Sequence, residues 1–119
     1  MQVTMLTTLQ AGAHAESLAT RVLLDRGYRI VERNYRIKAG ELDVVARDGD
    51  ILVFVEVRSR ADGNHGEASE MVHRGKRRQV SRVAAHYLEA RQPQFEECRF
   101  DVVAITGDRV ELFQDAWRL

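Results

Sequence analysis

The spacing of apolar residues changes along the chain from a helical period to strand-like runs, and these changes predict its elements. Apolar residues at helical spacing over 11–26 predict a first helix, which Gly27 ends. A second helical stripe, from Val80 to Leu88, predicts a helix over 76–91. Runs rich in apolar and β-branched residues predict five strands, over 28–37, 41–47, 51–58, 100–106 and 109–113. The order α-β-β-β-α-β-β is typical of an α+β domain with helices packed on a mixed sheet.

The remaining segments indicate the limits of the domain. We expect residues 1–10 to form an N-terminal tail and residues 11–119 a single domain, because 119 residues can build one core but not two. Residues 59–75 contain glycines and scattered charges without periodicity, which predicts a long loop. Residues 114–119 are expected to form a short tail. The strand over 51–58 is the most apolar and should lie in the centre of the sheet, covered on both faces.

Carboxylates occupy positions in the second and third predicted strands where apolar residues are expected. Because successive side chains of a strand alternate between its faces, Glu56 shares a face with Arg58. A hairpin turn of two or four residues centred on Asp48-Gly49 would place Asp43 opposite Phe54 and diagonal to Glu56, whereas a three-residue turn would not. The charged side chains would then lie on one side of the sheet, where the carboxylates can converge on a cation.

Two interpretations of these acids remain open. Desolvating a carboxylate is costly unless positive charge compensates it, so Asp43 and Glu56 are candidate ligands of Mg²⁺ or Mn²⁺. Such a metal can activate water against a phosphodiester, and Arg58 would stabilise the charge that develops on phosphate. Alternatively, Asp43, Glu56 and Arg58 form a salt-bridge network at the margin of the sheet. Glu16, at the edge of the apolar arc of the first helix, is either a further acid of the site or a solvated boundary residue.

Positive charge is concentrated at the start of the second predicted helix. A helix N-terminus already carries a partial positive charge, so cations placed there favour an incoming anion such as phosphate. The candidate nucleic-acid contacts are Arg74, Lys76, Arg77, Arg78 and Arg82. The alternative is a solvated basic face without a ligand. Few aromatic residues are interleaved with these cations, so base stacking is not indicated.

Composition narrows the classes of function. The chain has eighteen Lys and Arg against eighteen Asp and Glu, so nucleic-acid binding requires a local positive patch rather than a net charge. Cys98 is the only cysteine, which excludes a disulfide within the chain and a zinc site built from several cysteines. No apolar run approaches the roughly 20 residues of a membrane span. We therefore expect a soluble, cytoplasmic protein without a membrane partner.

Several short segments together resemble the YraN family of bacterial proteins over nearly the whole predicted domain. These segments are Ala15-Glu16, Gly27-Tyr28, Arg33-Asn34-Tyr35, Gly40-Glu41-Leu42-Asp43, Phe54-Val55-Glu56-Val57-Arg58 and Arg99-Phe100-Asp101-Val102-Val103. That family is similar to archaeal Holliday-junction resolvases and to the PD-(D/E)xK, restriction-endonuclease-like nucleases. The resemblance implies a restriction-endonuclease-like mixed sheet flanked by helices. It also implies that Glu16, Asp43 and Glu56 are metal-binding catalytic acids and that Arg58 matches the usual catalytic lysine.

Two residues depart from the pattern of the family. Arg58 replaces the usual lysine, and an arginine keeps its charge but does not readily act as a tunable acid or base. Ala15 stands where a glycine usually precedes the acid of the first helix, a change between small residues that should still permit close packing.

The leading hypothesis from these observations is a Mg²⁺-dependent endodeoxyribonuclease that binds DNA and hydrolyses phosphodiesters in branched or junction DNA. The alternative is a non-catalytic DNA- or RNA-binding protein that keeps the nuclease fold, with Arg58 marking the lost chemistry. A glycosidase that works with a pair of carboxylates would use the same acids, but the sequence lacks the aromatic residues typical of a sugar cleft. The resolvase resemblance also implies a homodimer.

Overall fold

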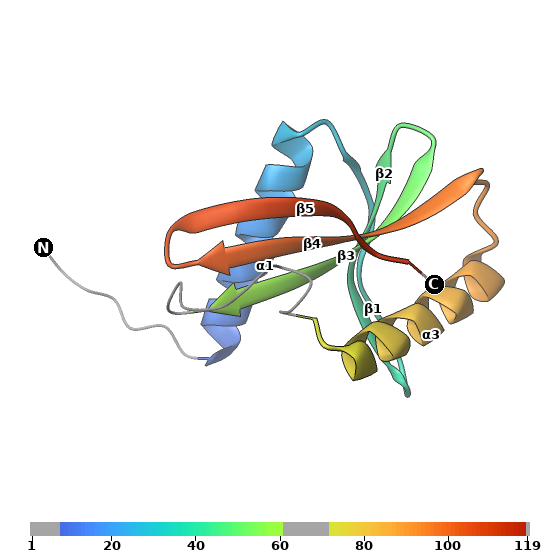
Figure 1. The fold of residues 1–119 in the computed structure, drawn as a ribbon, viewed down its shortest axis with the longest axis horizontal. Helices are drawn as coiled ribbons and strands as arrows, with labels where there is room; N and C mark the ends of the chain where they lie inside the picture. Colours follow the sequence, from blue (N-terminus) through green and yellow to red (C-terminus); the bar gives the residue numbers. More distant parts are fainter. Residues whose placement is uncertain (1–7, 61–71, 119) are drawn as a thin grey trace, which may run out of the picture.

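Two helices and five strands make up residues 8–60 and 72–118, the part of the chain that the computed structural model describes (Figure 1). They are α1 (Thr8–Asp25), β1 (Arg29–Ile37), β2 (Gly40–Asp48), β3 (Ile51–Arg60), α3 (Arg74–Arg91), β4 (Glu97–Thr106) and β5 (Arg109–Trp117). The order α-β-β-β-α-β-β confirms the predicted order and the α+β class. Neither helix of the described part is long and apolar enough to cross a membrane.

Three predicted segments differ from the structure. Residues 8–10 were placed in the tail but belong to α1, while residues 1–7 lie outside the described part. The predicted loop over 59–75 is shorter, because β3 continues to Arg60 and α3 begins at Arg74; residues 61–71 are also outside the description. The predicted tail from residue 114 is wrong as far as Trp117, which ends β5.

The strands form one five-stranded sheet in the order β1-β2-β3-β4-β5. β3 and β4 are parallel, and all other neighbouring strands are antiparallel. A parallel pair needs a crossover connection, which here includes α3. Residues 52–56 of β3 are all buried, which confirms the prediction that this strand is covered on both faces.

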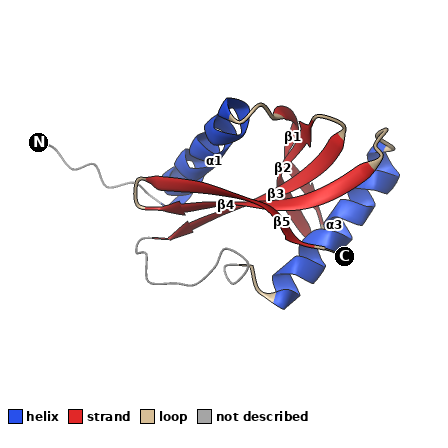
Figure 2. Cartoon of the chain, turned by 45° about the horizontal axis from the view of Figure 1, so that its top comes forward, coloured by secondary structure: helices blue, strands red, loops and turns tan. Residues whose placement is uncertain are grey.

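The two helices cover opposite faces of the sheet, as Figure 2 shows. On one face, α1 contributes small and branched side chains to a cluster that includes Ala15, Ala19, Leu23, Val44, Val53 and Val55. On the other face, α3 contributes to a cluster with more aromatic residues, including Leu52, Phe54, Val80, Val83, Tyr87, Phe100 and Trp117. Because Leu52 and Phe54 face α3, strand alternation directs Glu56 towards α3 as well.

The hairpin between β2 and β3 turns one residue later than predicted. Asp48 pairs with Ile51, so the two turn residues are Gly49 and Asp50. Gly49 has a φ of 61°, a left-handed conformation that glycine adopts without the steric cost of a Cβ atom. Asp48 stays in the ladder, where its carboxylate accepts a hydrogen bond from Arg99 at 2.9 Å.

Candidate functional site

The side chain of Asp43 joins β2 to β3 beyond the end of their backbone ladder. The ladder between the two strands reaches Val44 and Val55. One residue further, the Oδ2 atom of Asp43 accepts a hydrogen bond from the backbone N–H of Val57 at 2.8 Å. The carboxylate of Asp43 thus replaces a backbone partner and is held beside the part of β3 that carries Glu56.

The predicted pairing of Asp43 with Phe54 is wrong, because Val45 pairs with Phe54. The later turn at Gly49 shifts each pairing partner by two residues. A shift by an even number of residues keeps side chains on the same face of the sheet. Asp43 and Glu56 consequently remain neighbours on this face, and Asp43 contributes to the raised pKa of Glu56.

Glu56 is the buried member of this pair, with only 3% of its surface exposed. Its Oε1 atom lies 3.6 Å from Nζ of Lys76, and its Oε2 atom accepts no hydrogen bond from any described residue. Burial raises the pKa of Glu56 to about 9, and the neighbouring Asp43 acts in the same direction. The charges of Lys76 and Arg58 favour the ionised form. A buried oxygen without a hydrogen bond marks a place for a proton or a cation.

Arg58 lies two residues after Glu56 on β3 and is half-buried. Its charge lowers the pKa of Glu56, so it is near enough to act on the carboxylate pair, as strand alternation predicts. Its buried Nε–H donates no hydrogen bond to the described part of the chain.

Glu16 is not brought to the pair. Its carboxylate forms an ion pair with Arg33, at 3.7 Å, and it belongs to α1, on the face opposite α3. Among residues 8–60 and 72–118, no three acidic, histidine or cysteine side chains are grouped closely enough to hold a metal ion together. The structure therefore gathers Asp43, Glu56 and Lys76, with Arg58 near them, and leaves Glu16 elsewhere.

Two carboxyl groups with one unsatisfied oxygen suit a hard cation. Mg²⁺ often takes only one or two protein carboxylates and fills its other positions with waters and phosphate oxygens. Asp43 and Glu56 fit that donor set, and the buried Oε2 of Glu56 is the oxygen that lacks a partner. Glu16 would not be needed.

The role of Lys76 was not found from the sequence, which placed it among the outward phosphate contacts. A signal was present, because Lys76 lies four residues before Val80 and seven before Val83, on the apolar stripe of the helix. The structure shows this stripe facing the sheet, since Val80 and Val83 are buried. Lys76 therefore points towards the sheet, whereas Arg74, Arg78 and Arg82 are exposed.

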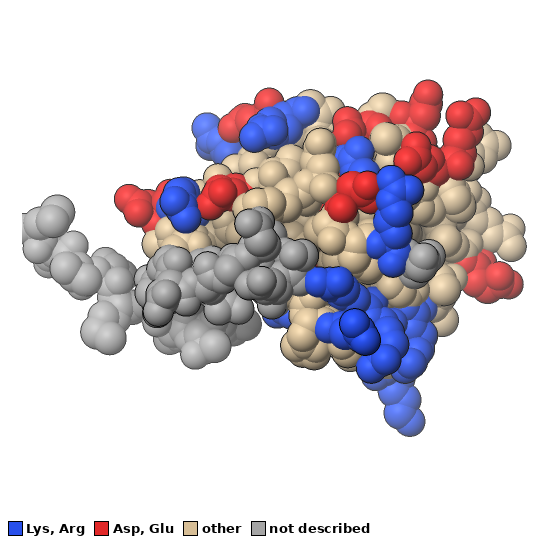
Figure 3. Space-filling model, in the orientation of Figure 1, with Lys and Arg blue, Asp and Glu red and all other residues tan. Residues whose placement is uncertain are grey.

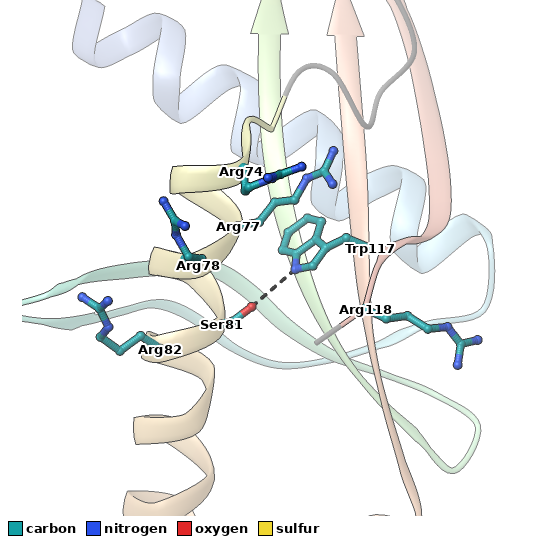
Figure 4. Close-up of a pocket in the computed structure, with 7 residues that line it drawn as sticks. All are labelled: Arg74, Arg77, Arg78, Ser81, Arg82, Trp117 and Arg118. Carbon is teal, nitrogen blue, oxygen red and sulfur yellow. Dashed lines mark hydrogen bonds between the residues drawn. The ribbon is translucent and has the colours of Figure 1, made fainter.

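The other basic residues line a pocket of about 560 Å³ between α3 and the end of β5 (Figure 4). We call this the arginine pocket; its lining residues are Arg74, Arg77, Arg78, Ser81, Arg82, Trp117 and Arg118. Figure 3 shows Lys and Arg side chains gathered over the start of α3 on this face of the molecule. Trp117 and Arg118 were not predicted as site residues, because they lie in the segment predicted to be a tail.

The arginines of this pocket differ in how they are held. Nε of Arg77 donates to the carbonyl of Val72 at 2.7 Å, and Arg118 pairs with Asp115 at 2.8 Å. The other three form an exposed row at four-residue spacing and have no ion pair with a described acid; they are Arg74, Arg78 and Arg82. The first turn of α3 contains no acidic residue to offset this charge.

Comparison with known proteins tests the resemblance to the YraN family. The profile of the uncharacterised protein family UPF0102 matches residues 15–105. A UPF0102 protein of Syntrophus aciditrophicus is 40% identical over 119 residues, covering 97% of this chain and 94% of the relative. A UPF0102 protein of Moorella thermoacetica is 45% identical over 106 residues, covering 89% of this chain and 88% of the relative.

A third relative carries the predicted family name. The UPF0102 protein YraN of Salmonella arizonae is 41% identical over 114 residues, which cover 94% of this chain and 87% of the relative. The predicted resemblance is thereby confirmed. With a matching profile over most of its length and relatives of this similarity, the chain belongs to the uncharacterised protein family UPF0102, the family of YraN.

Proposed function

We propose that this protein binds nucleic acid along the arginine pocket and hydrolyses phosphodiester bonds, with Mg²⁺, at Asp43 and Glu56. One observation carries the proposal: a buried glutamate with an unsatisfied oxygen adjoins a second carboxylate at the base of a helix whose outer face is rich in arginine. Among the described residues, a structural salt bridge explains neither the unsatisfied oxygen of Glu56 nor the exposed row of Arg74, Arg78 and Arg82.

Each group has a task that follows from its chemistry. The exposed guanidinium groups of Arg74, Arg78 and Arg82 can each bind phosphate with two N–H donors, which positions a strand without reading its sequence. Asp43, held by the backbone of Val57, and Glu56 would hold the metal. A bound Mg²⁺ polarises a phosphodiester and lowers the pKa of an attacking water. Arg58, whose Nε–H has no hydrogen-bond partner among the described residues, would stabilise negative charge that develops on the phosphate.

Binding without hydrolysis is the second candidate. The contact between Lys76 and Glu56 supports it, because an ammonium at 3.6 Å already compensates the buried carboxylate. In that case the pair is structural, and only the arginine pocket has a function. DNA or RNA would then bind equally well after a chelator has removed divalent metals.

Cleavage assays separate the two candidates. Labelled junction, flap and single-stranded DNA are incubated with the protein and Mg²⁺, Mn²⁺ or EDTA. We expect cleavage that requires metal and that Asp43→Ala lowers at least about 100-fold, as expected when a group at the reacting centre is lost.

Asp108→Ala is the matched control, because Asp108 lies exposed in the turn between β4 and β5. It should leave cleavage unchanged. Metal-dependent cleavage that persists in Asp43→Ala would overturn the assignment of the site. Binding without any cleavage would establish the second candidate, and absence of both would refute the proposal.

A further inference from the structure

Lys76 reaches the carboxylate pair from a different element than the strand acids. Its Nζ atom lies 3.6 Å from Oε1 of Glu56, and 26% of its side chain is exposed. It is the basic residue of α3 that contacts a carboxylate of the pair in the described part of the chain. The second oxygen of Glu56 is buried and has no hydrogen-bond partner in residues 8–60 and 72–118. One oxygen of the glutamate thus faces an ammonium, so a metal ion on the other oxygen would lie close to that positive charge.

The position of Lys76 is held by the packing of the first turns of α3. Nε2 of Gln79 donates to the carbonyl of Ala39 at 2.8 Å, which docks the helix on the turn between β1 and β2. At Gly40 the contact is so close that an added Cβ atom would lie 3.0 Å from Nε2 of Gln79. The Nδ1 atom of His73 accepts the backbone N–H of Lys76 at 3.1 Å. The backbone of Lys76 is therefore fixed, while its four-carbon stem can move.

Arg58 is less suited to the same task. A guanidinium is planar and rigid, whereas an ammonium on a flexible stem is a compact charge that can exchange one oxygen partner for another. Arg58 also leaves Nε–H unused beside the pair. Of the two cations near Glu56, Lys76 is the one that can move without disturbing the sheet.

Space for such a movement adjoins Lys76. A pocket of about 420 Å³ is lined by Lys76 and Gln79 of α3 and by the β1–β2 hairpin, including Arg36, Gly40 and Glu41. Glu41 is paired with Arg36 at 2.7 Å, so its carboxylate competes little with Glu56 for the ammonium. Lys76 lies between this open pocket and the buried Glu56.

We propose that Lys76 is the lysine of this carboxylate site, and that its ammonium and a divalent metal ion alternate on Glu56. In the free protein the ammonium lies beside Oε1 of Glu56. When a nucleic-acid phosphate enters beside α3, the ammonium moves to the phosphate and Glu56 becomes available to the metal. This inference rests on the proposed function, because it requires both a metal and a phosphodiester at the site.

The exchange makes metal and nucleic acid each favour binding of the other. Lys76 competes with the metal for one carboxylate, and a phosphate withdraws that competitor. By thermodynamic linkage, the metal must then strengthen phosphate binding by the same factor. Without nucleic acid, the metal should bind weakly.

A Mn²⁺ titration without nucleic acid tests the competition directly, with free Mn²⁺ followed by electron paramagnetic resonance. Lys76→Met keeps the apolar stem and removes the charge. Because a unit charge next to Glu56 disappears, we expect its Mn²⁺ affinity to rise at least about tenfold over the unsubstituted protein. Lys76→Arg keeps the charge and should remain near the unsubstituted value. Fluorescence of Trp117, the only tryptophan, verifies folding of each variant.

Arg78→Met is the matched control, since it removes a charge from the same helix without touching Glu56. It should change Mn²⁺ affinity less than about twofold, as a solvent-screened charge. The proposal is overturned if Lys76→Met binds Mn²⁺ no more tightly than the unsubstituted protein, if Arg78→Met has the same effect, or if no variant binds Mn²⁺.

DNA cleavage at saturating Mn²⁺ tests the second half of the exchange. Lys76→Met should bind metal more tightly yet cleave at least about tenfold more slowly, because the phosphate loses its ammonium. If Lys76 were purely structural, its removal would lower both the Mn²⁺ affinity and the cleavage rate. Equal cleavage rates would show that the ammonium does not act on phosphate. If the unsubstituted protein binds no DNA, the proposed function and the transfer to phosphate both fail, while the Mn²⁺ titration still decides whether Lys76 and metal compete.

Discussion

Glu56 shows at the scale of a single residue how the fold bears the cost of a buried acid. An isolated carboxylate in the middle of an apolar strand would lose most of its hydration. Lys76 compensates one oxygen, at 3.6 Å, and Arg58 contributes charge without a direct hydrogen bond to the pair. The remaining oxygen is uncompensated, so burial still raises the pKa of Glu56. The residue is retained in the core at a cost in stability, which is typical of functional positions.

The raised pKa predicts that Glu56→Gln stabilises the protein, and more so at higher pH. The pKa of Glu56 rises from an ordinary 4.5 to about 9 on folding, so its stability contribution is fully present below pH 4.5 and is lost as the pH rises towards 9. Glutamine does not titrate and avoids this loss. We measure the free energy of unfolding in urea with EDTA at pH 5 and pH 8. The advantage of Glu56→Gln over the unsubstituted protein should grow by at least about 1 kcal/mol between these two pH values, since one pKa unit corresponds to about 1.4 kcal/mol.

Glu41→Gln is the matched control for this prediction. The side chain of Glu41 is 38% exposed, and its ion pair in the described part of the chain is with the exposed Arg36, a contact that contributes less than about 1 kcal/mol. Glu41→Gln should change the free energy of unfolding by the same small amount at pH 5 and at pH 8. A stability difference for Glu56→Gln that does not grow with pH would contradict the direction of the pKa shift.

At the scale of elements, the interrupted pairing of β5 with β4 decides where the arginine pocket ends. The register shifts between Phe100 and Val102, and Asp115 has a left-handed φ of 55° opposite the irregular step. The fully buried Asp101 accepts the backbone N–H of Asp115 at 2.9 Å and so bridges the gap. Pairing resumes with Trp117, which stacks on Phe100 at 4.8 Å between ring centroids.

A buried polar network holds Asp101 in this place. It accepts hydrogen bonds from the hydroxyl of Tyr28 at 2.7 Å and from Nε of Arg99 at 2.8 Å. Burial and the hydrogen bond to Asp101 raise the pKa of Tyr28 to about 12, which keeps the hydroxyl a donor. Asp101 also raises the pKa of Arg99 and holds it in its charged form. All of these groups are satisfied, so the network is structural.

Asp101→Ala should therefore destabilise the protein by about 3–5 kcal/mol, because it leaves the charge of Arg99 only partly compensated in the interior. It should also loosen the end of β5. Urea unfolding measures the first effect, and a red shift in the fluorescence of Trp117 reports the second.

Asp115→Gly provides the contrast for this prediction. Glycine keeps the N–H that Asp101 accepts and adopts a positive φ more easily. The lost pair with Arg118 is exposed and screened by solvent, so its loss should have little effect on stability. Asp115→Gly should thus change stability by less than about 1 kcal/mol. If Asp101→Ala and Asp115→Gly lost equal stability, the backbone conformation, rather than the carboxylate of Asp101, would hold β5.

At the scale of the whole molecule, a net charge of zero conceals an uneven distribution of charge. Many acids are already paired, as in the contacts Arg91–Glu32, Arg36–Glu41 and Arg99–Asp48. Arg74, Arg78 and Arg82 on α3 have no ion pair with a described acid, and Figure 3 shows basic side chains concentrated over the start of α3. Such a patch attracts a polyanion locally even though the protein as a whole carries no net charge.

Nucleic-acid binding should accordingly depend on salt through this patch alone. We expect Arg78→Ala/Arg82→Ala to weaken DNA binding for all sequences and to reduce the slope of log affinity against log salt by roughly 2, because about 0.9 is lost for each phosphate contact on a duplex. Fluorescence anisotropy at several salt concentrations measures both quantities.

Arg21→Ala/Arg26→Ala removes the same charge from exposed positions in and just after α1 and is the matched control. This double variant should leave the slope of log affinity against log salt unchanged within experimental error. An equal reduction in both double variants would mean that DNA does not bind at the arginine pocket.

The hydrophobic pattern predicted the elements because burial imposes its period on the chain. The stripe from Val80 to Leu88 marked α3, and the apolar run of β3 marked the central strand. Alternation along β3 also placed Glu56 and Arg58 on one face. Helix ends were predictable where a residue has a special conformation, as at Gly27, where the N–H of Tyr28 bonds back to the carbonyl of Leu23 at 2.9 Å.

Partners between distant segments were not predictable, because periodicity says which face a residue occupies but not what lies against it. The local pattern allowed Glu16 to reach the sheet acids, yet Arg33 takes its carboxylate. The same pattern placed Lys76 with its basic neighbours, although it lies on the buried stripe and contacts Glu56. Both outcomes depend on how the helices dock.

By itself, the sequence determined the order of helices and strands, the central place of β3 and the acids that meet at its end, because these follow from local spacing and alternation. Only the tertiary structure decided that the turn falls at Gly49, that β5 continues to Trp117 and that Lys76 rather than Glu16 completes the carboxylate pair. The physical reason is that these features arise from contacts between segments far apart in the chain, such as Arg99 with Asp48 and Asp101 with Asp115. The strength of these contacts cannot be inferred from a local sequence pattern.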